Sequence, residues 1–143
     1  MHEKQRTRLT QRYRNYQKII TIFESEIFNI EDFSVLKTMG TIKCFELAFD
    51  LLWKLFKDYL TLQEIDIEII SPKPIIRKIA AVGLLEKMNV NGDLLFDMHK
   101  NRNNLVHVYD KAEAENIVAT IKNDYICEFK KVADFFERYL NDN

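Results

Sequence analysis

The sequence predicts an all-α protein: an up-and-down four-helix bundle with an additional short helix. Two observations lead to this prediction. The 143 residues include only three glycines and two prolines, whereas a β-sandwich or barrel of this length needs many more turn residues. Apolar side chains also recur at steps of three and four residues along most of the chain, which is the period of an amphipathic helix. The length suits a single domain covering residues 1–143.

Five helical segments follow from this spacing. The first covers about residues 5–30, and the second, which has the strongest apolar stripe, covers residues 42–60. The third opens at Ser71 and Pro72, because serine is a good N-cap and proline is tolerated in the first helical turn. Gly83 weakens the end of this third helix.

The last two predicted helices complete the chain. The fourth follows the turn residues 91–93. The fifth begins at Asp110, with Glu113 three residues later in a capping-box arrangement, and continues to about Leu140. We interpret the aromatic side chains on all of these stripes, Trp53 included, as the core of the bundle.

Charge and hydropathy narrow the classes of function. The chain has 21 basic and 22 acidic residues, for a net charge of −1, so it has no overall basic field that attracts nucleic acid. Any RNA binding therefore has to come from a local cluster of cations. The apolar runs are far shorter than the ~20 residues that span a bilayer. We therefore expect no membrane segment and a cytoplasmic protein.

The two cysteines do not suggest a special site. Cys44 and Cys127 lie far apart and lack the Cys-x-x-Cys or Cys/His spacing of a zinc or redox site. Both stand within apolar helical patterns, so we expect buried free thiols. The sequence gives no indication of a metal site or of a cofactor.

The segment between the fourth and fifth helices departs from the helical pattern. Three asparagines occupy four positions at 101–104, and asparagine disfavours a helix interior because its side chain competes for backbone hydrogen bonds. The segment is therefore either a helix end or held in place for another reason. It also brings Arg102, His107 and Tyr109 within eight residues of one another.

Arg102 and His107 together offer phosphate chemistry. A guanidinium can hold a phosphate through two parallel hydrogen bonds. An imidazole titrates near neutral pH and can move a proton as acid or base. The pair suffices to help an RNA 2′-hydroxyl attack its own phosphate without a metal ion. Such a pair is also a common coincidence: His107 can cap a helix, and Tyr109 can belong to the core.

Helix geometry restricts how this pair can act. On a regular helix, residues five apart point about 140° away from each other, so Arg102 and His107 do not face one cleft, whereas Asn103 and His107 share a face. Cooperation requires the helix to unwind after Asn104, Arg102 to reach around, or a symmetric dimer to join two copies. We therefore expect a homodimer formed through the helices that flank Arg102. We interpret His99 as a solvated side chain.

The residues Arg102-x4-His107-x-Tyr109 resemble the Arg-x4-His-x-Tyr signature of prokaryotic HEPN proteins, and Asn103 matches the polar residue that commonly follows the arginine. Residues 45–59 (FELAFDLLWKLFKDY) and 71–77 (SPKPIIR) are similar to the HEPN branch called nucleotidyltransferase substrate-binding proteins. In that branch a serine often precedes the histidine. Val106 stands there in this chain, which removes one hydrogen bond to phosphate.

The resemblance implies a usually dimeric bundle and a minimal nucleotidyltransferase partner encoded alongside. It leaves two functions open. In the first, the chain is a metal-independent endoribonuclease toxin that cleaves RNA with Arg102 and His107, and the partner is an antitoxin that transfers AMP to Tyr109. In the second, the chain has no catalysis of its own. The same residues, with Asn103 in support, then hold the phosphate of a nucleotide or other substrate for the partner enzyme.

Cations on the third predicted helix offer one extension of this site. They are Lys73, Arg77 and Lys78. Residues of this kind can widen a phosphate-binding surface. We interpret them instead as a solvated helix face.

Overall fold

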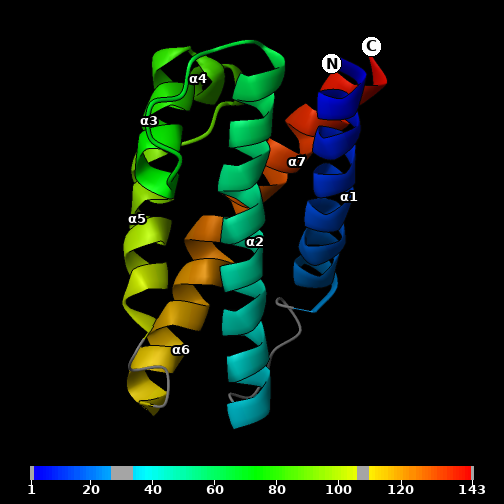
Figure 1. The fold of residues 1–143 in the computed structure, drawn as a ribbon. Coiled ribbons are helices and arrows are strands. Elements are labelled where there is room, and N and C mark those ends of the chain that lie inside the picture. Colours follow the sequence, from blue (N-terminus) through cyan, green and yellow to red (C-terminus); the bar gives the residue numbers. More distant parts are fainter. Residues whose placement is uncertain (1, 27–33, 106–109, 143) are drawn as a thin grey trace.

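The computed structural model describes residues 2–26, 34–105 and 110–142, and every regular element in these ranges is helical (Figure 1). The prediction of an all-α bundle is therefore confirmed. The four long segments of the bundle are α1 (His2–Glu26), α2 (Val35–Leu62), α5 (Gly92–Asn103) and a C-terminal rod. The rod consists of α6 (Lys111–Thr120), the π-helical turn η3 (Ile121–Tyr125) and α7 (Ile126–Asn141).

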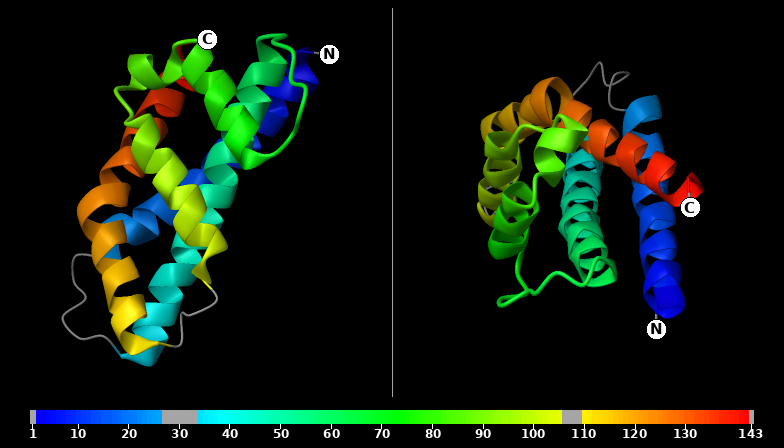
Figure 2. Two further views of the ribbon diagram at one scale, coloured as in Figure 1. Left: turned by 90° about the vertical axis from the view of Figure 1, so that its left-hand side faces the viewer. Right: turned by 90° about the horizontal axis from the view of Figure 1, so that it is seen from above.

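The long segments alternate in direction along the bundle. Helix α2 lies in the middle, with α1 on one side and α5 on the other (Figure 1). The C-terminal rod passes behind α2 and reaches α1, so the two ends of the chain lie at the same end of the bundle (Figures 1 and 2). The short helices α3 (Pro72–Ala81) and α4 (Leu84–Met88) stand at the end of the bundle where α2 finishes.

Local sequence signals explain several of the helix boundaries. The Ser34 side chain accepts a hydrogen bond from the Lys37 backbone N–H (3.3 Å) and caps α2. Asp110 caps α6 by accepting from the Glu113 N–H (3.1 Å), as the capping-box pattern predicts. Pro72 occupies the first turn of α3, also as expected.

Aromatic side chains form the core, which confirms their interpretation from the sequence. Tyr16 is fully buried, and its hydroxyl donates to the Phe129 carbonyl oxygen (2.6 Å). The Tyr13 hydroxyl donates to the Ala133 carbonyl (3.0 Å). These bonds satisfy phenol groups that would otherwise be buried without a partner, and they fix α1 against α7.

The structure differs from the expectations in four places. Helix α2 begins at Val35 and not at residue 42, and η3 divides the predicted fifth helix. Helix α4 was not predicted, because its five residues are too short to show a period; left-handed residues at Gly83 (φ 83°) and Asn89 (φ 58°) bracket it. The expectation that both thiols are buried was wrong for Cys127, which is exposed on α7 between the buried residues Ile126 and Glu128. Cys44 is partly buried, and this burial raises the pKa of its thiol.

No helix in the described ranges is both long enough and apolar enough to cross a membrane.

Candidate functional site

Helix α5 ends where the asparagine-rich segment predicts a helix end. Its last residue is Asn103, and Asn104 is the C-cap, whose N–H bonds to the carbonyl oxygens of Lys100 (3.2 Å) and Asn101 (3.1 Å). Arg102 therefore lies in the final turn of α5. His107 and Tyr109 lie outside the described residues, so their predicted roles stay predictions.

Arg102 faces α2, where a carboxylate lies near it. Its Nη2 atom is 3.9 Å from Oδ1 of Asp50. Asp50 is itself held by Lys54 (Nζ to Oδ2, 2.8 Å) and by the indole N–H of Trp53 (Nε1 to Oδ1, 3.3 Å). The Arg102 Nε atom is buried and has no hydrogen-bond partner within the described part of the chain. The carboxylate thus attracts the guanidinium without saturating its donors.

Trp53 has two contacts that explain its position. It is half-buried and packs against the core, as expected, and its indole N–H also orients Asp50. The ammonium group of Lys54 lies 5.9 Å from the centre of the indole ring, within the range of a cation–π contact. This part of α2 therefore combines apolar packing with a network of polar contacts beside Arg102.

His99 lies one turn before Asn103 on α5. Its Nε2 atom is 3.3 Å from Nδ2 of Asn103, and its ring centre is 5.9 Å from that of Phe49. Burial lowers the pKa of His99 below its usual value of 6.5, and the positive charges of Lys73 and Arg102 lower it further. The interpretation of His99 as simply solvated was therefore incomplete, because the ring is half-buried and lies in the field of Arg102.

The charges around the end of α5 suit an anion. Lys73 at the start of α3 and Arg102 both act on His99, which is neutral at pH 7 because its pKa is lowered. Asp50 is the carboxylate within ion-pair distance of Arg102 in the described chain. A phosphate at this place gains charge-assisted hydrogen bonds from the guanidinium, whereas a cation meets repulsion.

The π-helical turn η3 restrains the last turns of α5 through hydrogen bonds. The Ile126 N–H bonds to the Ile121 carbonyl oxygen, five residues back, which is the π-helical pattern. The buried Tyr125 hydroxyl donates to Asp97 and accepts from Asn101, both on α5. Burial and the bond to Asp97 raise the pKa of Tyr125, so its hydroxyl remains a donor at neutral pH.

The sequence contains a signal for this π-helical turn. The apolar residues Ile117, Ile121, Tyr125 and Phe129 follow three successive steps of four residues. A regular helix has 3.6 residues per turn, so each such step drifts by about 40°. A wider π-helical turn removes part of this drift and keeps the four side chains on the core.

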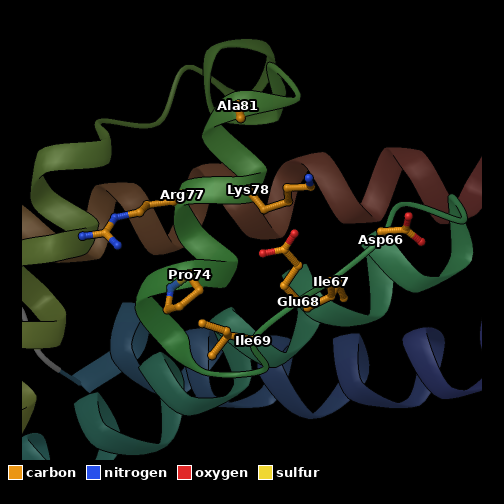
Figure 3. Close-up of a pocket in the computed structure, with 8 residues that line it drawn as sticks. All are labelled: Asp66, Ile67, Glu68, Ile69, Pro74, Arg77, Lys78 and Ala81. Carbon is orange, nitrogen blue, oxygen red and sulfur yellow. The ribbon is translucent and has the colours of Figure 1, made fainter.

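A separate groove lies between the segment after α2 and the helix α3. Figure 3 shows its lining, and its volume is about 390 Å³. Acidic and basic side chains both line it, with Arg77 and Lys78 pointing in different directions (Figure 3). Asp66 and Glu68 oppose a phosphate here, which agrees with our interpretation of the two cations as solvated.

Comparison with known proteins identifies the family. A search of the curated proteins finds no match. The family model described as "nucleotidyltransferase substrate binding protein like" matches residues 11–138. The matched range includes α2, α3 and α5, which carry Asp50, Lys73, His99 and Arg102. The chain therefore belongs to the nucleotidyltransferase substrate-binding protein-like family.

Proposed function

We propose that this chain is the HEPN-type component of a two-gene system with a minimal nucleotidyltransferase, and that it cleaves RNA without a metal ion. The observation that supports the proposal is the cluster at the end of α5. There, the Arg102 Nε has no hydrogen-bond partner among the described residues, and Lys73 and Arg102 both lie within electrostatic reach of His99. These groups offer a phosphate-binding site beside the segment that carries His107.

In the proposed reaction, Arg102 binds the scissile phosphate and neutralises the charge that develops on it. The ribose 2′-oxygen forms a bond to phosphorus, and the bond from phosphorus to the 5′-oxygen breaks. His107 accepts the 2′-hydroxyl proton and returns it to the departing 5′-oxygen. The products carry a 2′,3′-cyclic phosphate and a 5′-hydroxyl, so all atoms and protons are accounted for.

The family description favours a second candidate function. In this alternative, the chain is a non-catalytic subunit that presents a nucleotide or another phosphate-bearing substrate to the partner enzyme. Arg102 and Asn103 then hold the phosphate, and His107 supplies a further hydrogen bond. The same cluster serves both functions, so the two differ in whether a phosphodiester bond breaks.

Cleavage in the presence of EDTA separates the two candidates. The wild-type chain should cleave RNA and leave 2′,3′-cyclic ends, whereas His107→Ala and Arg102→Ala should lose at least about 100-fold in rate, as expected for lost acid–base and electrostatic catalysis. Mass spectrometry first shows that Tyr109 is unmodified, and circular dichroism shows that each variant is folded. Absence of cleavage by such wild-type protein would contradict the ribonuclease and favour the binding subunit.

We also propose that the partner regulates the chain by transferring AMP to Tyr109. A bulky anion on Tyr109, two residues from His107, would occupy the proposed RNA-binding site and repel the RNA backbone. Incubation with the partner, ATP and magnesium should add one AMP to the wild-type chain and none to Tyr109→Phe, as read by intact mass. Equal adducts on both proteins would place the acceptor elsewhere.

The proposed homodimer is supported by an exposed apolar patch on the first turns of α2, at the end of the bundle where α6 begins (Figure 1). Val35, Leu36 and Met39 are 71%, 84% and 52% exposed. Apolar side chains grouped in this way favour burial against another surface. Leu36→Asp should therefore give a monomer by sedimentation, whereas Ile22→Asp on α1 should not. A monomeric wild type at micromolar concentration would rule the dimer out.

A further inference from the structure

The outward side of α1 carries a concentration of positive charge that the proposed reaction does not use. Residues 4–22 contain six lysines and arginines and no acidic residue. Because the net charge of the whole chain is −1, the rest of the molecule is acidic on balance. Helix α1 lies at the edge of the bundle, so one side of it faces away from α2 and α7 (Figures 1 and 2).

Two of the six cations act within the fold. The Arg6 Nη2 atom donates to the Leu140 carbonyl oxygen (2.9 Å), and the Arg12 Nε atom lies 3.2 Å from Oδ2 of the buried Asp58. The other four are exposed, and none of them has an ion-pair partner in the described part of the chain, although the charge of Arg8 also acts on Asp58 from a longer distance. We name these four the basic face: Lys4, Arg8, Arg14 and Lys18.

The basic face is opposite the buried stripe of α1, as the helical period requires. That stripe comprises Leu9, Tyr13, Tyr16, Ile20 and Phe23. From Lys4 to Lys18 the face extends about 21 Å along the axis at 1.5 Å per residue. Exposed Thr7, Gln11 and Asn15 lie between the cations and add hydrogen-bonding groups.

A shallow depression marks the start of the basic face. Its volume is about 520 Å³, and its lining is Glu3, Lys4, Thr7, Arg8 and Gln11. Glu3 is the one carboxylate of this lining. It lies at the first turn of α1, before the acid-free stretch of residues 4–22 begins.

We propose that the basic face of α1 binds the sugar–phosphate backbone of RNA. The charge is complementary to a row of phosphates, and the interleaved amides and hydroxyl can bond phosphate and ribose oxygens without reading a base. A membrane surface fits less well, because the apolar side of α1 is buried in the bundle and is not available for insertion. The inference deepens the proposed ribonuclease, on which the choice of RNA rests.

The position of this face limits its role. Helix α2 separates α1 from α5, so the basic face and Arg102 lie on different sides of the bundle (Figures 1 and 2). A short oligonucleotide at Arg102 does not reach the basic face, whereas a long structured RNA can contact both. The face therefore contributes to the affinity for long RNA and not to the chemical step.

The test compares two double variants in the His107→Ala chain, which keeps the RNA intact. Arg14→Gln/Lys18→Gln removes two charges from the basic face, and Lys87→Gln/Lys130→Gln removes two exposed charges from α4 and α7. By fluorescence anisotropy with a long structured RNA, the first should lose about tenfold in affinity. The slope of log affinity against log salt should fall by about 1.8 where the face contacts duplex, at about 0.9 per phosphate, and by about 1.4 where it contacts a single strand, at about 0.7 per phosphate. The second variant should bind nearly as the parent does.

The proposal would be overturned if the two double variants bound RNA with the same affinity, whether that affinity equalled that of the parent or was reduced. Binding of the parent chain to phosphatidylserine vesicles but not to RNA would also overturn it, because the face would then serve a membrane. Cleavage is measured separately in the chain with His107 intact. Binding that depends on α1 without cleavage would remove the ribonuclease and keep the RNA-binding face, whereas cleavage with binding independent of α1 would do the reverse.

Discussion

Arg102 has a competing carboxylate nearby and, among the described residues, a donor without a hydrogen-bond partner. The distance of 3.9 Å from its Nη2 to Asp50 Oδ1 is an ion-pair distance and not that of a hydrogen bond. A bound phosphate can therefore take the bidentate position that Asp50 does not fill. The motif in the sequence predicted Arg102. It did not predict Asp50, because their contact joins residues 52 positions apart.

His99 provides a direct reporter of anion binding. Its imidazole should titrate below its usual pKa of 6.5 in the free protein, because burial and then Lys73 and Arg102 disfavour the cation. Inorganic phosphate or AMP bound between these cations should raise the pKa of His99, since the anion stabilises the imidazolium. A proton NMR titration of the imidazole with and without ligand measures both values.

A matched variant separates the two causes of this shift. Lys73→Gln removes one of the two cations but leaves the burial by Phe49, so the pKa of His99 should rise in the free protein. The effect of phosphate on that pKa should become smaller at the same time. A pKa of His99 that ligand leaves unchanged would contradict an anion site at the end of α5.

At the scale of elements, the π-helical turn connects the C-terminal rod to the end of α5. The Tyr125 hydroxyl bonds to Asp97 and Asn101, which lie on the same side of α5 one turn apart. Arg102 follows Asp97 by five residues on α5, so these hydrogen bonds restrain the helical turn that carries Arg102. The sequence analysis predicted one continuous helix here, and only the fold showed the π-helical turn and its partners on α5.

Tyr125→Phe should destabilise the protein by about 1–3 kcal/mol, because it removes the hydroxyl of a buried tyrosine together with its hydrogen bonds to the Asp97 carboxylate and the Asn101 amide. Tyr16→Phe is the control, since it removes another fully buried hydroxyl, the one bonded to Phe129, far from α5. Chemical denaturation should give similar losses for both. Only Tyr125→Phe should also weaken phosphate binding; equal affinities for the two variants would show that the contact is purely structural.

At the scale of the whole molecule, α1 and α2 are joined by a buried ion pair. Asp58 is 4% exposed, and its carboxylate lies 3.2 Å from Arg12 and 3.9 Å from Lys57. Burial raises the pKa of Asp58 above 3.8, although Arg12, Lys57 and Arg8 oppose the rise. The folded state thus holds the Asp58 proton more tightly than the unfolded chain does.

The raised pKa of Asp58 makes the stability of the protein depend on pH. The contribution of Asp58 to stability is complete below its unfolded pKa and is lost as the pH rises through the higher folded pKa. The free energy of unfolding of wild type minus that of Asp58→Asn should therefore increase as the pH falls from 7 towards about 4. Urea denaturation across this range measures the difference. A difference that decreases on acidification would mean that the ion pair outweighs burial.

Local sequence signals were sufficient to predict the long helices and the family, but not the short helix α4 or the π-helical turn η3. The apolar period, the cap Asp110 and the asparagine-rich end of α5 are local signals that depend on neighbouring residues, so they could be read without the fold. The same holds for Arg102 as a candidate. The cap Ser34 was not predicted, because the apolar stripe of α2 was traced only from Ile42. The roles of His107 and Tyr109 remain predictions from the motif alone.

The surroundings of Arg102, Tyr125 and Asp58 depend on the tertiary structure. Asp50 beside Arg102, Tyr125 behind α5 and Arg12 against Asp58 are contacts between residues far apart in sequence. The basic face likewise could not be defined without the fold. Six cations are distributed along α1, and only the packing shows that two of them, Arg6 and Arg12, contact other helices. Period and capping fix each helix locally, whereas the charge environment of a side chain depends on which other helix packs against it.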